Sequence, residues 1–281
     1  MSKHLSPLVV CSGLILLGLV VTAVFAPYVA PHNPTRERLI DRLLPPTWAE
    51  DGDWQYILGT DHLGRDLLSR IIYGSRVSLV VGFAAVIIGG VLGTTLGVVA
   101  GFFGGFSDEI IMALADMQLA FPTILLAIAV IAVLGPSFSN LVLVIGISGW
   151  VTYARVARGQ VLSLREKEFV EAIRAQGGSR LRIIWHHILP NVLAPLIVVA
   201  TLDLARTIIL ESTLSFLALG IQPPTPSWGG MLSDGREYLL SAWWIATFPG
   251  VALMLTAVSF NRLGDWLRDR ADPRLRRTEL R

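Results

Sequence analysis

The sequence contains little charge, almost no lysine and a single cysteine. Only 16% of its 281 residues are charged and 53% are hydrophobic, whereas a soluble domain is typically about 25% charged. Because Cys11 has no second cysteine to pair with, an internal disulfide framework is excluded. Neither lysine, Lys3 or Lys167, follows a glycine. The phosphate loop Gly-x-x-x-x-Gly-Lys-[Ser/Thr] is therefore absent, and the chain cannot bind and hydrolyse ATP by that route.

Motifs for catalysis and for metal binding are missing as well. The sequence has no paired-cysteine, His-Glu-x-x-His or Gly-x-Ser-x-Gly motif. His186 and His187 are adjacent, so on a helix they point about 100° apart and cannot bind one metal as an i,i+4 pair would. We therefore predict no catalytic residue, no metal site and no cofactor in this chain, and we expect no nucleic-acid partner.

Long uncharged runs are present instead. Leu5–Pro31, Val77–Ser107 and Met117–Ala154 contain no Asp, Glu, Lys or Arg, and one bilayer crossing needs about 20 apolar residues. Backbone amides in lipid must be bonded internally, which such runs achieve as helices. The first run is longer than the apolar part of a signal peptide, so we interpret it as a retained anchor. We predict an all-α polytopic membrane helix bundle with six transmembrane helices, at 8–28, 77–101, 112–134, 140–157, 192–217 and 241–261.

Six crossings place both termini on one side, and positive charge indicates which side. Lys and Arg are more than twice as frequent in the N-terminus, the 155–182 loop and the C-terminal tail as on the other side. Because these residues are enriched in cytoplasmic loops, we expect both termini to be cytoplasmic. The whole chain, 1–281, is predicted to be one domain. Its parts are a first span (8–28), an extracytoplasmic segment (31–76), a five-span core (77–261) with a cytoplasmic loop (155–191), and a cytoplasmic basic tail (262–281).

Two patterns lie at span two and one lies in span three. The approach to span two is amphipathic, with Leu63, Leu67, Leu68, Ile71 and Ile72 on one half of a helical wheel. It suits the membrane surface, a protein groove, or a surface helix that leads into the span. Gly89, Gly93, Gly97 and Gly101 form a small-residue stripe, which we interpret as close helix packing rather than a gating surface. In span three, the proline of Phe121-Pro122 removes one backbone hydrogen bond and is predicted to kink the helix.

Span five contains three ionisable residues, Asp203, Arg206 and Glu211. Each costs about 2.5–3.5 kcal/mol at the centre of an isolated transmembrane helix, so a partner or a cavity is needed. Asp203 and Arg206 are i,i+3 neighbours and can pair. Two interpretations stay open: the three residues line a substrate path, or they form a salt bridge that joins helices.

The 155–191 loop has a helix–glycine–helix pattern. The first helix is predicted to end near Gln176, with Phe169, Ala172 and Ile173 on its apolar face, and Gly177 suits the left-handed residue that ends a helix. Ser179 is a candidate N-cap for a second short helix, whose predicted stripe is Leu181, Ile184, Trp185 and Ile188. Pro190 fits the first turn of span five. An apolar face on a short loop must be buried, either against the membrane face of the chain itself or by a partner.

One motif in this loop resembles a known family. The pattern Glu171-Ala172-x4-Gly177-x11-Leu189-Pro190 resembles the Glu-Ala-Ala loop of ABC importer permeases. Ile173 departs from that pattern in place of a second alanine, and Ile188 is shifted by one position, as in the peptide/nickel subgroup. Residues 58–66, 69–74 and 219–229 also look like sequences of this subgroup. The chain is most similar to the second permease of dipeptide and oligopeptide importers.

The resemblance implies partners and a mechanism. It implies an inner-membrane permease of a prokaryote that pairs with a homologous second permease and with two cytoplasmic ATPase subunits, which hold ATP and Mg. An extracytoplasmic substrate-binding protein would deliver the substrate. The residues implied to form the ATPase-coupling site are Glu171, Ala172, Ile173, Gly177, Ile188, Leu189 and Pro190. Within the subgroup, a nickel or other small-solute permease is the alternative to a peptide permease. From a different class, a secondary transporter driven by an ion gradient would use Asp203, Arg206 and Glu211 as its relay.

Overall fold

The structure, a computed structural model, describes residues 6–271. Within that range the chain is helical, with no strand beyond one isolated bridge between Thr60 and Asp66, as the all-α prediction requires. Five helices are long and apolar enough to cross a bilayer, or up to six if the bent pair α4–α5 is one span. The helices are α1 (Pro7–Val24), α2 (Ala26–Val29), η1 (Leu39–Asp41), α3 (Leu67–Phe103), α4 (Gly105–Leu119), α5 (Thr123–Leu134), α6 (Phe138–Arg165), α7 (Glu168–Ala175), α8 (Arg180–Ile183), η2 (Ile184–Ile188), α9 (Leu189–Phe216), α10 (Trp228–Arg236) and α11 (Trp244–Ala271).

The chain divides into two compact units. The first unit contains the described residues up to Phe83, together with Ile128–Val142 and Leu204–Leu263. The second unit contains Ala84–Ala127, Leu143–Asp203 and the described residues from Gly264 onwards. Both units share residues of α3, α5, α6, α9 and α11, and each unit is described by itself.

Two tryptophans organise the core of the first unit. The Trp228 indole is fully buried and donates a hydrogen bond to the carbonyl oxygen of Ile71 at 3.0 Å. A Cβ at Gly74 would lie 2.8 Å from Trp228 Cδ1, so only glycine leaves room for this ring. Trp244 donates to the carbonyl oxygen of Thr60 at 3.1 Å. Both indoles thus satisfy their N–H groups: Trp228 joins α10 to the first part of α3, and Trp244 joins α11 to the loop before α3.

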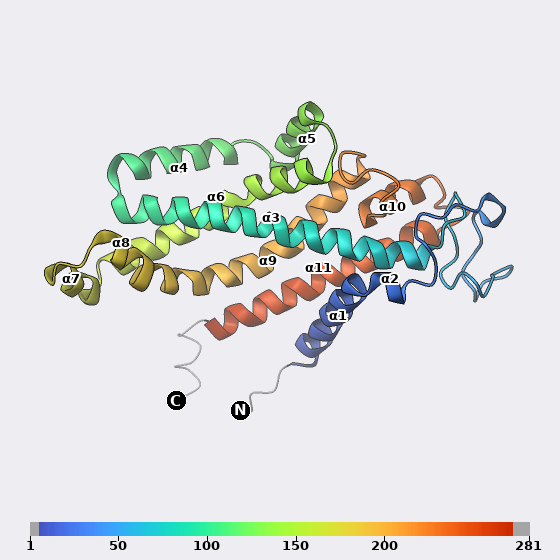
Figure 1. Cartoon of the computed structure of the whole chain (residues 1–281), viewed down its shortest axis with the longest axis horizontal. Coiled ribbons are helices and arrows are strands. Elements are labelled where there is room, and N and C mark those ends of the chain that lie inside the picture. Colours follow the sequence, from blue (N-terminus) through green and yellow to red (C-terminus); the bar gives the residue numbers. More distant parts are fainter. Residues whose placement is uncertain (1–5, 272–281) are drawn as a thin grey trace. The chain divides into compact units, whose positions relative to one another are not determined.

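The glycine stripe of α3 forms the core contact of the second unit, in which α4 and α6 run alongside this end of α3 (Figure 1). A Cβ at Gly93 would overlap the carbonyl oxygen of Trp150, and a Cβ at Gly97 would overlap that of Ala154. At Gly101 it would lie 2.8 Å from Val161 Cβ. Small residues therefore bring α3 and α6 into backbone contact, which confirms the packing interpretation of the stripe.

The boundaries of several helices differ from the predicted spans. The helix of predicted span two is α3, and it begins at Leu67 rather than at 77. Most of the amphipathic stretch is therefore the first part of α3 and leads directly into the span. Its polar half is buried rather than solvated, because Arg65 and Arg70 are paired with carboxylates. Near Pro122 the third predicted span bends by 88° between α4 and α5, a break rather than a kink. Pro122 has no backbone N–H to donate, and it disfavours a helical conformation at Phe121. The helical hydrogen-bond ladder is therefore interrupted at residues 120–122.

Candidate functional site

The loop between α6 and α9 contains the predicted hinge at Gly177. Gly177 has a φ of +80°, the left-handed conformation that glycine adopts at no steric cost. Its N–H donates to the carbonyl oxygen of Arg174 at 3.0 Å, and the N–H of Gly178 donates to that of Ile173 at 2.9 Å. These two bonds form a Schellman motif, which satisfies the last carbonyls of α7. The turn is therefore a defined structure rather than a flexible link.

Ile173, where the loop departs from the Glu-Ala-Ala pattern, packs over this turn. A Cβ at Gly178 would lie 2.5 Å from Ile173 Cγ2, so the second glycine provides the space that the larger side chain needs. A residue with a side chain at position 178 would therefore clash with Ile173 at the turn where α7 ends.

The second helix of the loop starts as predicted and then continues without interruption. The Ser179 hydroxyl caps α8 by accepting from the N–H of Arg182 at 3.3 Å. The five-residue π-helix η2 joins α8 to α9, and Pro190 is the second residue of α9. Proline lacks the N–H of a regular α-helical ladder, and Asn191 donates from its side chain to the carbonyl oxygen of His187 at 2.7 Å. The π turn and this side-chain bond keep the helix continuous past Pro190.

The side chains of the predicted apolar stripe differ in their exposure. Ile188 is fully buried, but the other fully buried side chain of the short helix is Ile183, which the prediction left out. Leu181 and Trp185 are instead 67% and 63% exposed. The step from Ile183 to Ile188 is five residues, which equals the hydrogen-bond spacing of a π turn, whereas the prediction assumed α-helical spacing.

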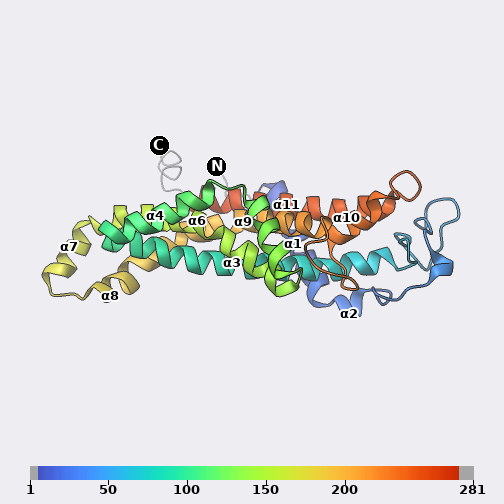
Figure 2. The ribbon, with the colours of Figure 1, turned by 90° about the horizontal axis from the view of Figure 1, so that it is seen from above.

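An apolar surface is consequently left uncovered on the loop. Phe169 on α7 is 40% exposed, and the exposed Leu181 and Trp185 follow on α8 and η2. The predicted coupling residues Glu171, Ala172 and Gly177 are exposed, and Ile173 is half-buried. In Figure 2, α7 and α8 project at one end of the second unit. Within residues 6–271 the chain leaves these side chains partly or mostly exposed, and the choice between the membrane face and a partner stays a prediction.

The three ionisable residues of span five have different surroundings. In the second unit, Asp203 accepts a hydrogen bond from the Tyr153 hydroxyl at 3.0 Å. In the first unit, Glu211 is fully buried, and Ser78, Ser212 and Ser215 donate to it at 3.2, 3.3 and 2.8 Å. Arg206 is exposed. The predicted pairing of Asp203 with Arg206, and the choice between a substrate path and a structural pair, stay predictions.

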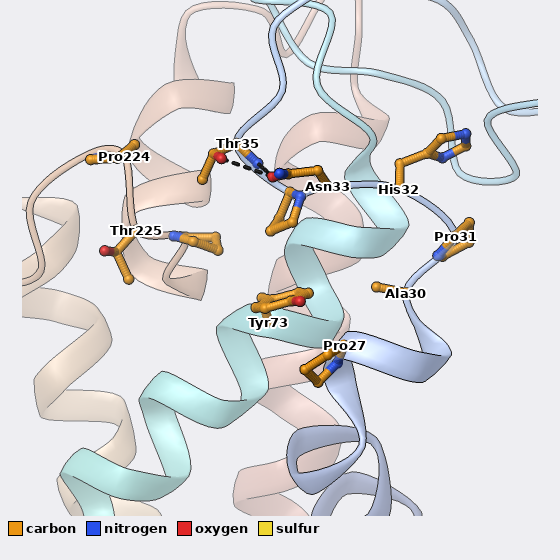
Figure 3. A pocket seen from close by; sticks show the side chains of 11 residues that line it. Pro27, Ala30, Pro31, His32, Asn33, Thr35, Tyr73, Pro224 and Thr225 are labelled. Carbon is orange, nitrogen blue, oxygen red and sulfur yellow. Dashed lines mark hydrogen bonds between the residues drawn. The ribbon is translucent and has the colours of Figure 1, made fainter.

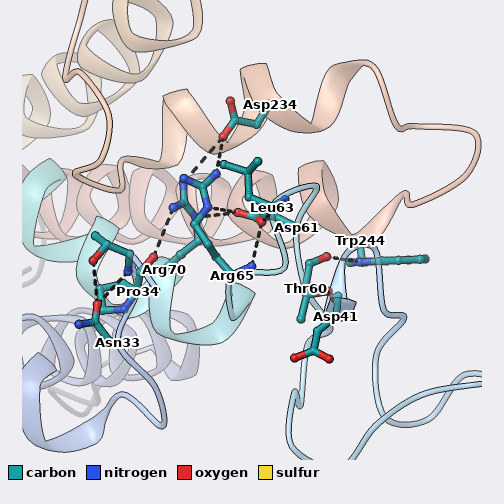
Figure 4. A network of polar contacts seen from close by, with 11 residues as sticks. Asn33, Pro34, Asp41, Thr60, Asp61, Leu63, Arg65, Arg70, Asp234 and Trp244 are labelled. Carbon is teal, nitrogen blue, oxygen red and sulfur yellow. Dashed lines mark hydrogen bonds and ion pairs between the residues drawn. The ribbon is translucent and has the colours of Figure 1, made fainter. Parts of the chain in front are cut away.

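A buried ion-pair network lies in the first unit, at the beginning of α3 (Figure 4). Arg65 donates from Nε to Asp61 at 2.6 Å and from Nη2 to Asp234 on α10 at 3.4 Å. Arg70 Nε lies 3.3 Å from the same Asp61 oxygen. These two arginines and Asp61 are at most 5% exposed. The opposite charges offset part of the loss of hydration, and the network joins the segment before α3 to α10.

Beside this network the first unit contains a pocket of about 620 Å³ (Figure 3). Tyr73, His32 and Asn33 line it, together with prolines of two loops, among them Pro31 and Pro224. Nearby, burial and a hydrogen bond donated to Asp41 raise the pKa of Tyr56, which therefore stays a neutral donor. Proline-rich walls are conformationally restricted, so the pocket is largely preformed.

Sequence reasoning missed the partners of these charged groups. Tyr153 lies 50 residues from Asp203, and no local spacing connects them. Two of the three serines around Glu211 follow it at positions i+1 and i+4, a pattern that was available. The Asp61–Arg65 pair also has the i,i+4 spacing, but its third member, Asp234, is 169 residues from Arg65.

Comparisons with known proteins match nearly the whole chain. Residues 93–277 match the family described as binding-protein-dependent transport system inner membrane component. Residues 6–46 match the N-terminal transmembrane domain of oligopeptide transport permease C. The first match alone covers more than half of the chain.

Several relatives are similar over most of their length. The di/tripeptide transport system permease protein DppC of Pseudomonas aeruginosa is 44% identical over 94% of this chain and 87% of the relative. The probable D,D-dipeptide transport system permease protein DdpC of Escherichia coli is 44% identical over 96% of this chain and 88% of the relative. A chain from an inward-facing structure of the MetNI methionine ABC transporter has a TM-score of 0.59 at 18% identity, covering 73% of this chain and 98% of that chain. That likeness concerns the fold alone.

Proposed function

Because the chain belongs to the family of inner membrane components of binding-protein-dependent transport systems, we propose that it forms one of two permease subunits of an importer for dipeptides and related short peptides. It is a multi-pass inner membrane permease, and ATP is hydrolysed by separate subunits. The substrate class rests on relatives named as dipeptide or di/tripeptide permeases. A nickel or other small-solute cargo is the alternative within the same transport class.

The uncovered apolar surface of the loop is the observation that carries the proposal. Leu181 and Trp185 are more than 60% exposed, on a loop that is held rigid by the Schellman turn and by the continuous helix into α9. Exposed apolar groups that cluster on a short ordered element are typical of a protein interface. The chain has no phosphate loop, so the energy of ATP must enter through such an interface.

We assign the coupling residues two tasks. Glu171 and Ala172 are exposed and form part of the surface presented to the ATPase subunit. The other residues position that surface: Ile173 and Gly177 determine the turn, and Ile188, Leu189 and Pro190 join it to α9. ATP-driven closure of the ATPases would move the loop and tilt the helices between inward-open and outward-open states.

The remaining partners are assigned by side. With the termini and the loop in the cytoplasm, two ATPase subunits bind the loops of this chain and of a homologous second permease. The segment 31–76 and the 217–227 loop, which line the pocket of the first unit, face outwards and receive the substrate-binding protein. Asp203, Arg206 and Glu211 are candidate residues of the substrate path, and selectivity is expected mainly in the binding protein.

Co-purification with the ATPase tests the coupling assignment. Leu181→Asp is expected to reduce the amount of ATPase that co-purifies with the permease, because it places a charge in the apolar contact. Leu240→Asp is the matched control, since Leu240 is also an exposed leucine but lies on the extracytoplasmic side in our assignment. Equal ATPase recovery from Leu181→Asp and the wild type would contradict the coupling role.

Reconstitution tests the energy source and the cargo. Vesicles that contain the complete transporter and a loaded binding protein are expected to accumulate a labelled dipeptide only with ATP. Uptake driven by a proton or sodium gradient in the absence of ATP would instead indicate a secondary transporter. Binding of a nickel chelate rather than a dipeptide by the cognate binding protein would move the cargo to the alternative.

A further inference from the structure

Three arginines from the loop region converge on the corner between α3 and α4, which we define as residues 101–108. Arg158 near the end of α6 donates from Nε and Nη2 to the two oxygens of Asp108, at 2.5 and 2.6 Å. Arg165, the last residue of α6, donates to the carbonyl oxygen of Gly101 at 2.9 Å. The Arg174 guanidinium on α7 lies 5.7 Å from the centre of the Phe102 ring. All of these contacts are within the second unit.

The corner has a backbone that glycine makes tight. Gly104 and Gly105 both have positive φ, +66° and +53°, so α4 starts two residues after α3 ends. The last carbonyls of α3 and the first N–H groups of α4 are therefore side by side. Arg165 contacts a carbonyl of the negative end of α3, and Asp108 lies in the first turn of α4, its positive end. Both charges complement the helix dipoles and strengthen the attachment.

The Arg158–Asp108 pair differs from the other ion pair that joins the same two helices. Its side chains are 33% and 20% exposed, and the contact is bidentate. Arg155 and Asp116 are joined by one contact, at 49% and 68% exposure. A partly buried bidentate pair is geometrically specific and strong, whereas an exposed single pair contributes little.

We propose that Arg158 is a positioning residue for coupling, which fastens the α3–α4 corner to the end of α6 so that both move with the loop when the ATPases close. Motion of α7 is then passed to the end of α3 directly through Arg174, and motion of α6 is passed to the ends of α3 and α4 through Arg165 and Arg158. This inference rests on the coupling role of the loop proposed above. It adds that the ATP-driven movement also reaches the start of α4, through the contact between Arg158 and Asp108.

The test measures dipeptide uptake per ATP hydrolysed in the reconstituted transporter. Asp108→Asn removes the charge at nearly constant volume, and we expect uptake per ATP to fall on the order of tenfold, the scale of one lost charge-assisted hydrogen bond. ATPase co-purification and ATP hydrolysis should stay close to wild type. Asp116→Asn is the matched control, and it should leave uptake per ATP unchanged because it breaks the exposed pair.

Two further variants separate coupling from folding. Arg158→Lys keeps the charge but not the bidentate contact, and it should give an intermediate ratio of uptake to ATP. Asp108→Arg combined with Arg158→Asp should recover part of the ratio that either change alone removes. Equal uptake per ATP in Asp108→Asn and Asp116→Asn, with the ATPase still bound, would overturn the inference but not the proposed function. Failure of the ATPase to co-purify with the wild-type chain would instead overturn the proposed function.

Discussion

The close contact between α3 and α6 can be tested by adding one methyl group. We choose Gly97→Ala, because the nearest atoms to the new Cβ are the carbonyl oxygen of Ala154, the Cα of Ala154 and the Cβ of Ala157. None of these atoms can rotate away as a long side chain would. The two helices must therefore separate, and other glycine contacts along the stripe would loosen with them.

The size of the effect follows from two opposing contributions. Overpacking of a close contact costs about 1–3 kcal/mol, and rigid neighbours place this site near the upper value. Replacing glycine by alanine inside a helix stabilises it by up to about 1 kcal/mol. We expect a net loss of about 2 kcal/mol for Gly97→Ala. Gly90→Ala on the same helix meets only the Tyr153 ring, at 3.6 Å or more. It should be neutral or stabilising.

The measurement is the thermal unfolding midpoint of the purified permease in detergent or nanodiscs. Gly97→Ala should lower the midpoint, and Gly90→Ala should leave it unchanged or raise it. If Gly97→Ala is as stable as Gly90→Ala, the backbone contact between α3 and α6 is not as close as the structure has it. A loss in both variants would point to a general intolerance of α3 rather than to the contact.

Three further predictions concern the loop and span five. Gly177→Asp should uncouple ATP hydrolysis from transport, because a side chain at this positive φ strains the backbone by about 1–2 kcal/mol. Gly159→Asp is the control, since Gly159 is an exposed helical glycine with open space around it. Persistence of both transport and ATPase stimulation in Gly177→Asp would refute the role of the hinge. Glu211→Ala should destabilise the permease by about 1–3 kcal/mol because buried serine hydroxyls lose their acceptor. Glu211→Gln, which keeps an acceptor, should lose less in the same unfolding assay. Asp203→Asn with an unchanged midpoint but altered substrate preference in uptake competition would support a path role, whereas loss of expression alone would indicate a structural pair.

Local patterns in the sequence were sufficient for the order of the helices and for the turn in the loop. The uncharged runs predicted helices in the right order, because lipid leaves the backbone no other solution. Gly177 and Ser179 were found because a helix end and a helix start each need one residue type at one position. The glycine stripe of α3 likewise predicted a close helix contact, although not that α6 is the neighbour.

Features that depend on distant residues could not be predicted in this way. The π turn before Pro190 changes which side chains are buried, and no composition rule distinguishes it from an α-helical turn. Asp108, the bidentate partner of Arg158, is 50 residues away. Its helix, α4, also contains Asp116, and no sequence pattern distinguishes the two aspartates as partners. The 88° bend at α4–α5 was anticipated only as a kink, because the extent of a proline break depends on what packs around it.

The exposed face of the loop has a consequence for how the cell must produce this subunit. Burial of a large apolar side chain contributes about 1.5–3 kcal/mol, and Phe169, Leu181 and Trp185 each have roughly half of that still to gain. A permease synthesised in excess of its ATPase would keep this face in water, where it favours self-association and recognition by quality-control proteases. We therefore expect the abundance of the chain to follow that of its ATPase, with orphan copies degraded faster than assembled ones.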